Sequence, residues 1–271
     1  MSVRLAVVVT SRGGLSFARR CLESIRWQQE VVATQLVYVD DASDYTPGER
    51  RRLRDLVETA DGTLLCNEKR RWQVGSIARA MARINDPGAI VCLVDGDDWL
   101  LPHAFRTVAE AYGDPQIAMT WGNTLVDFRP FQDPQSSYFG PDKRTVNTPY
   151  ADEIWNHRLF RQDGFRCFHL RTFRRWLWDF IHPKDLSLPS GEPFRGSGDS
   201  ALMFPMLELL ADPKHACFID EPIYVYRLHG DQVHHLDKAG QREGLEALRS
   251  RMPPYAPLNR GLLASLLREN R

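Results

Sequence analysis

Short apolar runs alternate with amphipathic segments along residues 1–121 of the chain. Runs of aliphatic and β-branched residues predict buried strands, and the segments between them predict helices. The predicted strands cover residues 5–9, 36–39, 63–66, 90–94 and 117–121. Because parallel strands need crossover connections such as these helices, the pattern predicts an α/β domain built on a mostly parallel sheet.

Two of the predicted helices carry clear local signals. Phe17, Cys21 and Ile25 recur at helical spacing after the first predicted strand. After the second strand, Thr46 can cap a helix, Pro47 suits the first helical position, and Glu49 completes a capping box. We therefore expect a helix that begins here and reaches about residue 59.

The pattern changes after residue 121. Two long loops are predicted at 127–149 and 182–198, and an apolar helix, interrupted by Pro205, is predicted over 200–210. Residues 223–228 form a last predicted strand. The tail from 237 to 271 predicts one or two amphipathic helices divided at Pro253 and Pro254.

Composition and charge exclude several classes of protein. The 271 residues are 43% apolar and 26% charged, which is ordinary for a globular chain with a sizeable core. Thirty-five basic residues balance 35 acidic ones, so no net field draws the protein toward nucleic acid or an anionic membrane. Nucleic acid is therefore an unlikely partner, although local charged patches remain open.

Cysteine usage and the short apolar runs bear on the compartment. The five cysteines are widely spaced without a C-x-x-C pair, which predicts buried thiols in a reducing environment. Residues 5–9 are too short for a secretory signal or a membrane span, and so are residues 176–181. The sequence thus predicts a cytoplasmic protein without a transmembrane segment, and peripheral contact with a membrane stays open.

Three carboxylates follow the apolar run 90–94 directly. Asp95, Asp97 and Asp98 should project from the carboxyl end of a strand, where open α/β sheets bind ligands. Such a cluster repels itself and is stabilised by a hard cation such as Mg²⁺ or Mn²⁺, with a diphosphate as co-ligand. The alternative is a solvated acidic turn before the next helix. We favour the cation because the run follows a buried strand.

A second acidic pair, Asp40 and Asp41, ends the predicted strand 36–39. Asp and Ser are common turn formers, so a structural role is equally compatible with this segment. Two acidic strand ends of one sheet would nevertheless line the same crevice. A carboxylate placed there can accept hydrogen bonds from a base or a ribose.

Arginines and aromatic residues alternate through residues 155–178. Such a pattern can bind sugars or nucleic acid by stacking. The simpler interpretation, which we favour for most of these residues, places the aromatics in the core and the arginines outside. The segment as a whole is expected to border an acceptor site.

These motifs together resemble family 2 of the inverting nucleotide-sugar glycosyltransferases, over residues 5–229 approximately. In chain order, the matching residues are Val9-Thr10-Ser11-Arg12, Val39-Asp40-Asp41-Ala42-Ser43, Asn67 with Gly75 and Ala78-Arg79-Ala80, Asp95-Gly96-Asp97-Asp98-Trp99, Gly198-Asp199, and Tyr224-Val225-Tyr226-Arg227-Leu228-His229. Each piece alone is weak, whereas their order and spacing are specific.

The resemblance implies a GT-A fold, an α/β single domain in which helices flank a mixed sheet. Residues 1–121 would form its nucleotide-sugar-binding half, 122–236 its acceptor-binding and catalytic-base half, and 237–271 a helical tail. The chain would be a transferase that moves a sugar from a nucleotide diphosphate to an acceptor hydroxyl. The UDP-sugars are the expected donors. A carbohydrate, a lipid-linked glycan, a protein or a small molecule could be the acceptor.

The resemblance also assigns residues to the donor and to a divalent cation, Mn²⁺ or Mg²⁺. The donor-binding residues would be Thr10, Ser11, Arg12, Asp41, Asn67, Gly75, Arg79, Asp95, Gly96 and Arg227. Asp41 would accept a hydrogen bond from uracil, and Asp95 would contact the ribose or the sugar. Asp97 would hold the cation, with His229 as an additional ligand. His234 and His235 are weaker candidates for a diphosphate contact.

On the acceptor side, the resemblance implies a general base at Asp199. Here the chain has Gly198 where the family commonly has a glutamate, so Asp199 is the sole carboxylate. The simpler role for Asp199 is a helix cap, which does not exclude catalysis. Asp98, Trp99 and Trp121 are further candidates on this side, although Trp99 could instead pack beneath the metal loop.

Three other functions remain open from the sequence alone. Phosphatases of the haloacid dehalogenase class also place Asp-x-Asp after a strand, but there Thr or Val follows, whereas Asp97 precedes Asp98 and Trp99. A sugar-nucleotide pyrophosphorylase expects a glycine-rich basic loop, of which Arg12-Gly13-Gly14 is a faint trace. The chain could also be a module that binds a nucleotide-sugar without catalysis.

Overall fold

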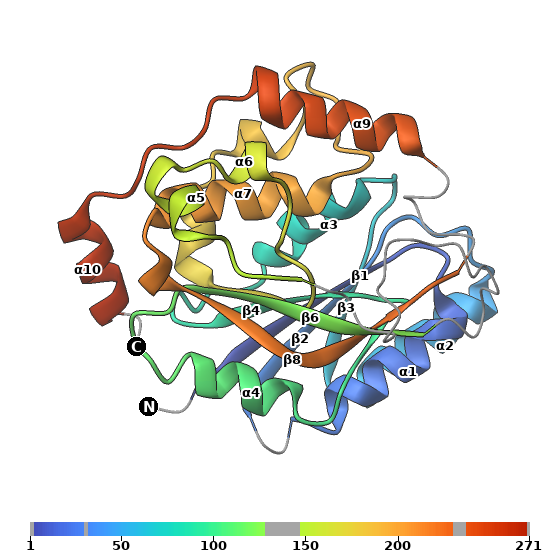
Figure 1. Cartoon of the computed structure of the whole chain (residues 1–271). Coiled ribbons are helices and arrows are strands. Elements are labelled where there is room, and N and C mark those ends of the chain that lie inside the picture. Colours follow the sequence, from blue (N-terminus) through green and yellow to red (C-terminus); the bar gives the residue numbers. More distant parts are fainter. Residues whose placement is uncertain (1–2, 30–31, 128–146, 230–236, 270–271) are drawn as a thin grey trace.

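The computed structural model describes residues 3–29, 32–127, 147–229 and 237–269. Within these residues, one eight-stranded mixed sheet lies between two layers of helices (Figure 1). The strands are β1 (Leu5–Ser11), β2 (Thr34–Asp40), β3 (Gly62–Cys66), β4 (Ile90–Asp95), β5 (Trp99–Leu100), β6 (Met119–Asp127), β7 (Arg171–Arg174) and β8 (Ala216–Arg227).

The helices divide into those of the first half of the chain and those that follow β6. The first group is α1 (Leu15–Arg26), α2 (Pro47–Thr59), α3 (Trp72–Met81) and α4 (Ala104–Ala111). The second is α5 (Asp152–His157), α6 (Phe160–Asp163), α7 (Gly198–Leu210), α9 (Lys238–Glu246) and α10 (Arg260–Glu269). Short 3₁₀ helices cover Arg175–Phe180, Pro183–Leu186 and Pro213–His215, and a π-helical turn, Ala247–Arg251, continues α9.

The strand order is β3-β2-β1-β4-β7-β6-β8-β5. The strands β3, β2, β1 and β4 pair in parallel, and β7 then pairs antiparallel with both β4 and β6. The strand β8 runs parallel to β6, and the short β5 adds to it antiparallel. The four parallel strands direct their carboxyl ends toward one edge of the sheet, which is where the acidic motifs lie.

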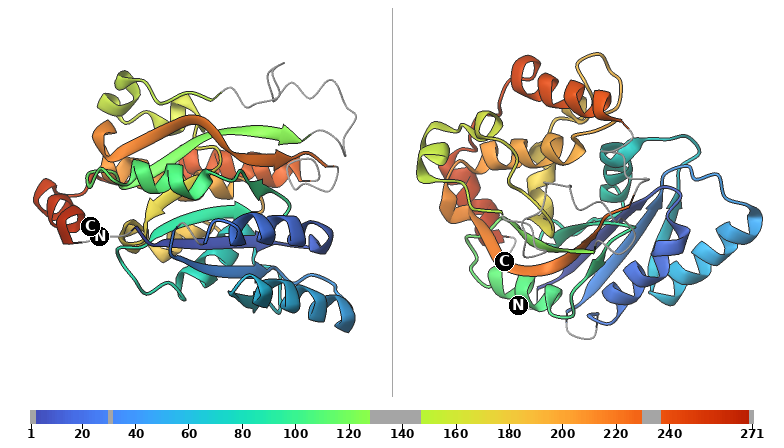
Figure 2. Two further views of the ribbon diagram at one scale, coloured as in Figure 1. Left: turned by 90° about the horizontal axis from the view of Figure 1, so that it is seen from below. Right: turned by 45° about the vertical axis from the view of Figure 1, so that its right-hand side comes forward.

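Both faces of the parallel strands are buried, which explains their nearly continuous apolar runs. In β1, Ala6 and Val8 face a core that includes α3 and α7, whereas Leu5, Val7 and Val9 face a second core that includes α1, α2 and α4. Figure 2 shows these two helical layers on opposite faces of the sheet.

Most of the strands predicted from apolar runs are confirmed. The predictions at 5–9, 36–39, 63–66 and 90–94 all fall within β1 to β4. The prediction at 117–121 is shifted, because the strand runs from Met119 to Asp127, and that at 223–228 captures only the end of β8. Of the loop expected at 127–149, Asp127 instead ends β6 and residues 147–149 are irregular as expected, whereas residues 128–146 lie outside the described part.

The helices predicted from local sequence signals are confirmed, with two differences in α7. Thr46 caps α2 through the backbone N–H of Glu49, and Glu49 returns the bond, so the capping box is confirmed. The helix predicted at 200–210 begins at Gly198 and continues through Pro205. The tail forms helices on both sides of Pro253 and Pro254, as expected.

The arginines of the segment 155–178 correct the expectation that they would lie outside. Arg161, Arg171 and Arg174 are buried, with 4%, 1% and 3% of their surface exposed. A guanidinium is buried only where carboxylates or carbonyls satisfy it. Arg174 donates to the carbonyl of Ile117, and the other two arginines bind carboxylates.

Arg161 joins the core helix α7 to the C-terminal tail. Its guanidinium makes two parallel hydrogen bonds to Glu208 of α7, at 2.5 and 2.8 Å. It also donates to the carbonyls of Leu248 and Met252, while the second oxygen of Glu208 accepts from the backbone N–H of Tyr255. This buried pair is fully satisfied, and it fixes the tail to the domain.

Glu208→Ala is therefore expected to lower the free energy of unfolding by about 3–5 kcal/mol, because it leaves the Arg161 charge buried without its counter-charge. Urea unfolding followed by circular dichroism measures this change. The matched control is Glu246→Ala, which breaks the exposed pair with Arg251 and should cost less than about 1 kcal/mol. Equal losses in the two variants would contradict the role given to the buried pair.

Two other expectations bear on the environment of the chain. Cys21, Cys92 and Cys167 are buried as predicted, but Cys66 is exposed because it ends β3 at the edge of the sheet, and Cys217 is partly buried. Among the described residues, no helix combines the length and the apolar character that crossing a membrane requires.

Candidate active site

A cavity of about 590 Å³ opens at the carboxyl ends of β1 and β4. Its volume lies within the range of small-molecule sites, which is about 300–1,000 Å³. Thr10, Ser11, Asp95 and Asp97 line it, and so does Asp199 at the start of α7. The cavity therefore brings together carboxylates that lie about a hundred residues apart in the sequence.

The three carboxylates at the end of β4, those of Asp95, Asp97 and Asp98, do not share one environment. Asp95 and Asp97 line the cavity, with 28% and 27% of their side chains exposed. Burial raises the pKa of Asp95 to about 7, a shift that Arg171 opposes and that Asp199 and Asp97 reinforce. The site thus concentrates negative charge where a cation or a cationic side chain would be stabilised.

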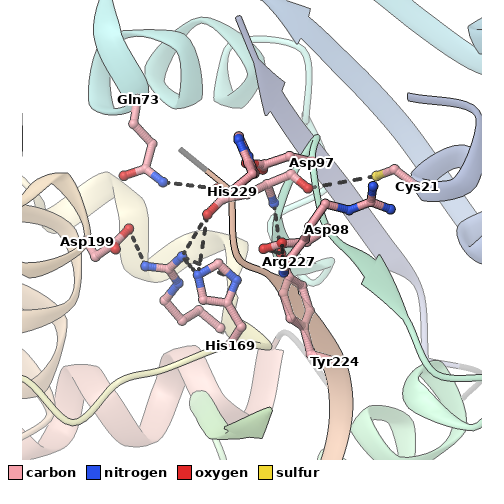
Figure 3. Close-up of polar contacts among 11 residues, drawn as sticks. Cys21, Gln73, Asp97, Asp98, His169, Asp199, Tyr224, Arg227 and His229 are labelled. Atoms are coloured by element: carbon pink, nitrogen blue, oxygen red, sulfur yellow. Dashed lines mark hydrogen bonds and ion pairs between the residues drawn. The ribbon is translucent and has the colours of Figure 1, made fainter. Parts of the chain in front are cut away.

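Asp98, by contrast, is 1% exposed and anchors the loop to β8. It accepts hydrogen bonds from the hydroxyl of Tyr224 and the backbone N–H of Arg227, both at 2.8 Å (Figure 3). Burial, reinforced by Asp97 and Asp95, raises the pKa of Asp98 well above its ordinary value. The expectation that Asp98 faces an acceptor does not match this placement.

Asp97 and His229 meet at the mouth of the cavity. The Oδ2 atom of Asp97 lies 2.7 Å from Nε2 of His229, and both side chains line the cavity. The ring of His229 packs on Phe17 of α1, with centroids 5.0 Å apart. A carboxylate oxygen and an imidazole nitrogen at this spacing form two adjacent ligand positions, so the predicted pair fits a divalent cation.

A second group of potential ligands lies deeper. Among the described residues, Asp95, Asp98 and His169 offer ligand atoms within 4.8 Å of one another. Both oxygens of Asp98 already accept hydrogen bonds, and the guanidinium of Arg171 lies against His169 and Asp95. This cationic neighbour would compete with a metal at this group.

Asp41 lines the other end of the cavity and is held by several donors. Its carboxylate accepts from the backbone N–H groups of Arg71 and Trp72, at 2.7 and 2.8 Å, where α3 begins. It also accepts from the side chain of Asn67, which in turn accepts from Arg79. Asn67 and Arg79 thus stand behind Asp41 rather than in the cavity wall.

Of the remaining predicted donor residues, some line the cavity and others lie behind its lining. Thr10, Ser11 and Arg12 line the cavity. Gly96 lies behind them and is needed for close packing, since a Cβ atom there would stand 2.6 Å from Cβ of Ser11. Gly75 sits within α3, where a Cβ atom would stand 2.9 Å from Cβ of Arg71.

Trp99, Trp121 and Arg227 pack against neighbouring side chains. Trp99 is 8% exposed and lies between two guanidinium groups, those of Arg20 and Arg227, at 3.4 and 5.0 Å from its ring. Trp121 is 2% exposed and packs against Tyr150 and Phe218. Neither tryptophan is among the residues that line the cavity, which is at odds with an acceptor contact.

Asp199 occupies the first turn of α7 and lines the cavity. The capping position belongs to Ser197, so the structure replaces the expected role of Asp199 as a helix cap. Its carboxylate forms an ion pair with Arg171 of β7 (Figure 3), and 36% of the side chain is exposed. A partly exposed carboxylate that lines a cavity is suited to take a proton.

Several side chains that line the same cavity were not among the predicted site residues, although His169 and Arg171 lie in the segment 155–178 that was expected to border an acceptor site. His169 and Arg171 come from β7 and the segment before it, Gln73 comes from α3, and Tyr226 comes from β8. Gln73 donates to Asp95 at 3.1 Å. Burial and Arg171 lower the pKa of His169 well below its ordinary value, so its ring is neutral. Tyr226 stands within the family motif and could have been singled out there.

The tail contributes to the wall beside Asp199. Gln241 and Leu245 of α9 line the cavity, and the hydroxyl of Ser197 donates to the carbonyl of Gln241 at 2.8 Å. Gly196 allows this approach, because a Cβ atom there would stand 2.7 Å from Cα of Gln241. His234 and His235 lie outside the described residues.

The comparisons with known proteins agree with this geometry. The family model described as "Glycosyl transferase family 2" matches residues 6–179, more than half of the chain. A search of curated proteins gives no match.

Among solved structures, the TarS 1-349 fragment from S. aureus in complex with UDP-GlcNAc matches with a TM-score of 0.60 and 14% identity, over 88% of this chain and 61% of that one. The longer TarS chain matches with a TM-score of 0.55 and 15% identity, over 100% of this chain and 43% of that one. This chain thus spans less than two thirds of either protein.

A third structure, the mannosyltransferase PcManGT from Pyrobaculum calidifontis in complex with GDP-Man and Mn²⁺, matches with a TM-score of 0.62 and 16% identity, over 99% of this chain and 69% of that one. At these identities the likeness shows the fold, and it confirms the expected GT-A architecture.

Proposed function

Since the chain belongs to glycosyl transferase family 2, we propose that it moves a sugar from a nucleotide diphosphate to an acceptor hydroxyl, with inversion at the anomeric carbon. The observation that carries the proposal is the cavity itself. It gathers the carboxylates of Asp95, Asp97 and Asp199 and the imidazole of His229. Donor and acceptor would meet among these side chains.

The donor would lie along the carboxyl ends of the parallel strands. Thr10, Ser11 and Arg12 would contact the nucleotide, and residues 1–121 would form the donor half of the domain. Asp41 already accepts three hydrogen bonds from the protein, so at most about one further acceptor position remains for a base. We propose a UDP-sugar, with the UDP-GlcNAc bound to TarS as support.

A divalent cation would be held by Asp97 and His229. When bound, it would neutralise the negative charge that grows on the leaving diphosphate. Because one of its ligands is an imidazole nitrogen, whereas Mg²⁺ strongly prefers oxygen, we propose Mn²⁺. The Mn²⁺ complex of the mannosyltransferase supports this choice.

Asp199 would act as the general base. It would take the proton of the acceptor hydroxyl as the hydroxyl oxygen attacks the anomeric carbon and the bond to the diphosphate breaks. The attack would come from the face opposite the leaving group, which inverts the configuration. Residues 122–236 would bind the acceptor, whether a carbohydrate, a lipid-linked glycan, a protein or a small molecule.

The proposal predicts that the protein releases a nucleoside diphosphate from at least one nucleotide-sugar when Mn²⁺ is present, and that chelation with EDTA stops the release. A panel of UDP- and GDP-sugars, assayed with and without candidate acceptors, identifies the donor. The correct donor should also raise the melting temperature, because binding stabilises the folded state. A raised melting temperature without release from any donor would favour a binding module instead.

A further inference from the structure

Arg171 lines the cavity and contacts two carboxylates, those of Asp95 and Asp199. Its Nη1 atom forms an ion pair with Oδ1 of Asp199, and its Nη2 atom lies 3.8 Å from Oδ2 of Asp95. The same Nη2 atom contacts Nε2 of His169. The guanidinium of Arg171 therefore connects the carboxylate of Asp95 to that of Asp199, the expected base.

Arg171 is a buried charge held between these groups by ion pairs. The side chain is 1% exposed, and it comes from β7, whose backbone pairs with β4 on one side and β6 on the other. A guanidinium is planar and offers its donors in a fixed fork, so a buried arginine orients the groups that it binds. His169, whose ring is neutral, accepts from Arg171 without adding charge.

The neighbours of Asp199 leave its position dependent on Arg171. Gly198 precedes it, and a Cβ atom there would stand 2.8 Å from Oε1 of Gln73 and 3.0 Å from Cγ2 of Val74. A larger residue at 198 would press on these side chains of α3, so the side chain of Gln73 would have to shift. Among the described residues, the ion pair with Arg171 is the polar contact of the Asp199 carboxylate.

We propose that Arg171 is a positioning residue for the transfer reaction, and that it acts by orienting Asp199 toward the acceptor hydroxyl. It also keeps Asp199 in a fixed relation to Asp95, and thus to the donor. This inference rests on the proposed function. It goes beyond that function, because it assigns the geometry of the base to a buried side chain of β7.

A double-mutant cycle tests the inference. Arg171→Lys keeps the positive charge but loses the planar fork, so kcat should fall about tenfold to a hundredfold while the donor KM changes less than about threefold. In the Asp199→Asn background, the same change should alter kcat by less than about threefold, because the group through which Arg171 acts is gone. If the factors by which the two substitutions lower kcat multiply in the double variant, the substitutions act independently and the proposal is overturned.

A matched control separates positioning from a general loss of structure. Arg174→Lys changes another buried arginine of the same strand, which donates to the carbonyl of Ile117 outside the cavity. Its kcat should stay within about twofold of the wild type, whereas a loss like that of Arg171→Lys would show that any change in β7 disturbs the site. Active protein is counted in each variant by nucleotide binding in a calorimeter.

The four proteins of the cycle are the wild type, the two single variants and the double variant. They also distinguish failure of this inference from failure of the proposed function. If the wild type turns over no nucleotide-sugar, the proposed function fails, and the cycle is measured on unfolding in urea instead. Coupling between Arg171 and Asp199 in that measurement would sustain the pairing. Additive effects on unfolding would overturn it.

Discussion

Asp97→Ala is expected to lower kcat/KM for sugar transfer at least about a thousandfold, because it removes the carboxylate that would hold the cation against the diphosphate. Asp97 is well placed for this role, since it is partly exposed, lines the cavity, and lies 2.7 Å from the Nε2 atom of His229. The variant should fold, because no buried pair is broken. Release of the nucleoside diphosphate at saturating Mn²⁺ measures the effect.

The control for this variant is Asp179→Ala, which removes an exposed carboxylate that pairs with Arg175 away from the cavity. It should leave turnover unchanged. Manganese binding, followed by calorimetry in the presence of the nucleotide, should weaken in Asp97→Ala alone. Full activity of Asp97→Ala would contradict the assignment of the metal site to Asp97 and His229.

Asp199→Asn is expected to lower kcat about a hundredfold to ten-thousandfold, because the amide is nearly isosteric with the carboxylate but cannot take the proton of the acceptor. Donor binding should change little, since Asp199 belongs to α7 and not to the strand ends that would bind the nucleotide. The comparison of kcat with the dissociation constant of the donor tests this separation.

Two outcomes would contradict the role of Asp199. Retention of kcat would show that another group takes the proton. A loss of donor binding equal to the loss of kcat would show that Asp199 contacts the donor instead. Asp179→Asn is the control, and it should leave both quantities unchanged.

The donor side of the site was largely predictable from local sequence. A buried parallel strand is a nearly continuous apolar run, and its carboxyl end is marked by the first polar residues that follow. This reasoning placed Asp41 and Asp95 at one edge of the sheet, and both line the cavity, whereas Thr10 was assigned only by the family resemblance. It did not require knowledge of any contact between distant segments.

Asp98 shows where such reasoning fails. In the sequence it is the third member of an acidic run, and nothing local separates it from Asp97. Its burial depends on the hydroxyl of Tyr224 and the N–H of Arg227, which come from β8 far along the chain. Only the tertiary structure shows that one carboxylate of the run is structural and its neighbour faces the cavity.

Arg171 was hidden for a related reason. The strand β7 has four residues and two arginines, so it lacks the apolar alternation by which strands are recognised. Arginine is exposed in most proteins, and its burial here depends on the carboxylates of Asp95 and Asp199, which other elements supply. The same holds for Arg161, whose partner Glu208 lies on α7.

The central claim is that the chain transfers a sugar with inversion, and proton NMR of the anomeric region tests it most directly. With an α-linked nucleotide-sugar and Mn²⁺, we predict that the anomeric signal of the donor declines while the β anomer of the product appears first, whether the acceptor is a hydroxyl compound or water. An α product, or an unchanged donor signal for every nucleotide-sugar in the panel, would contradict the account.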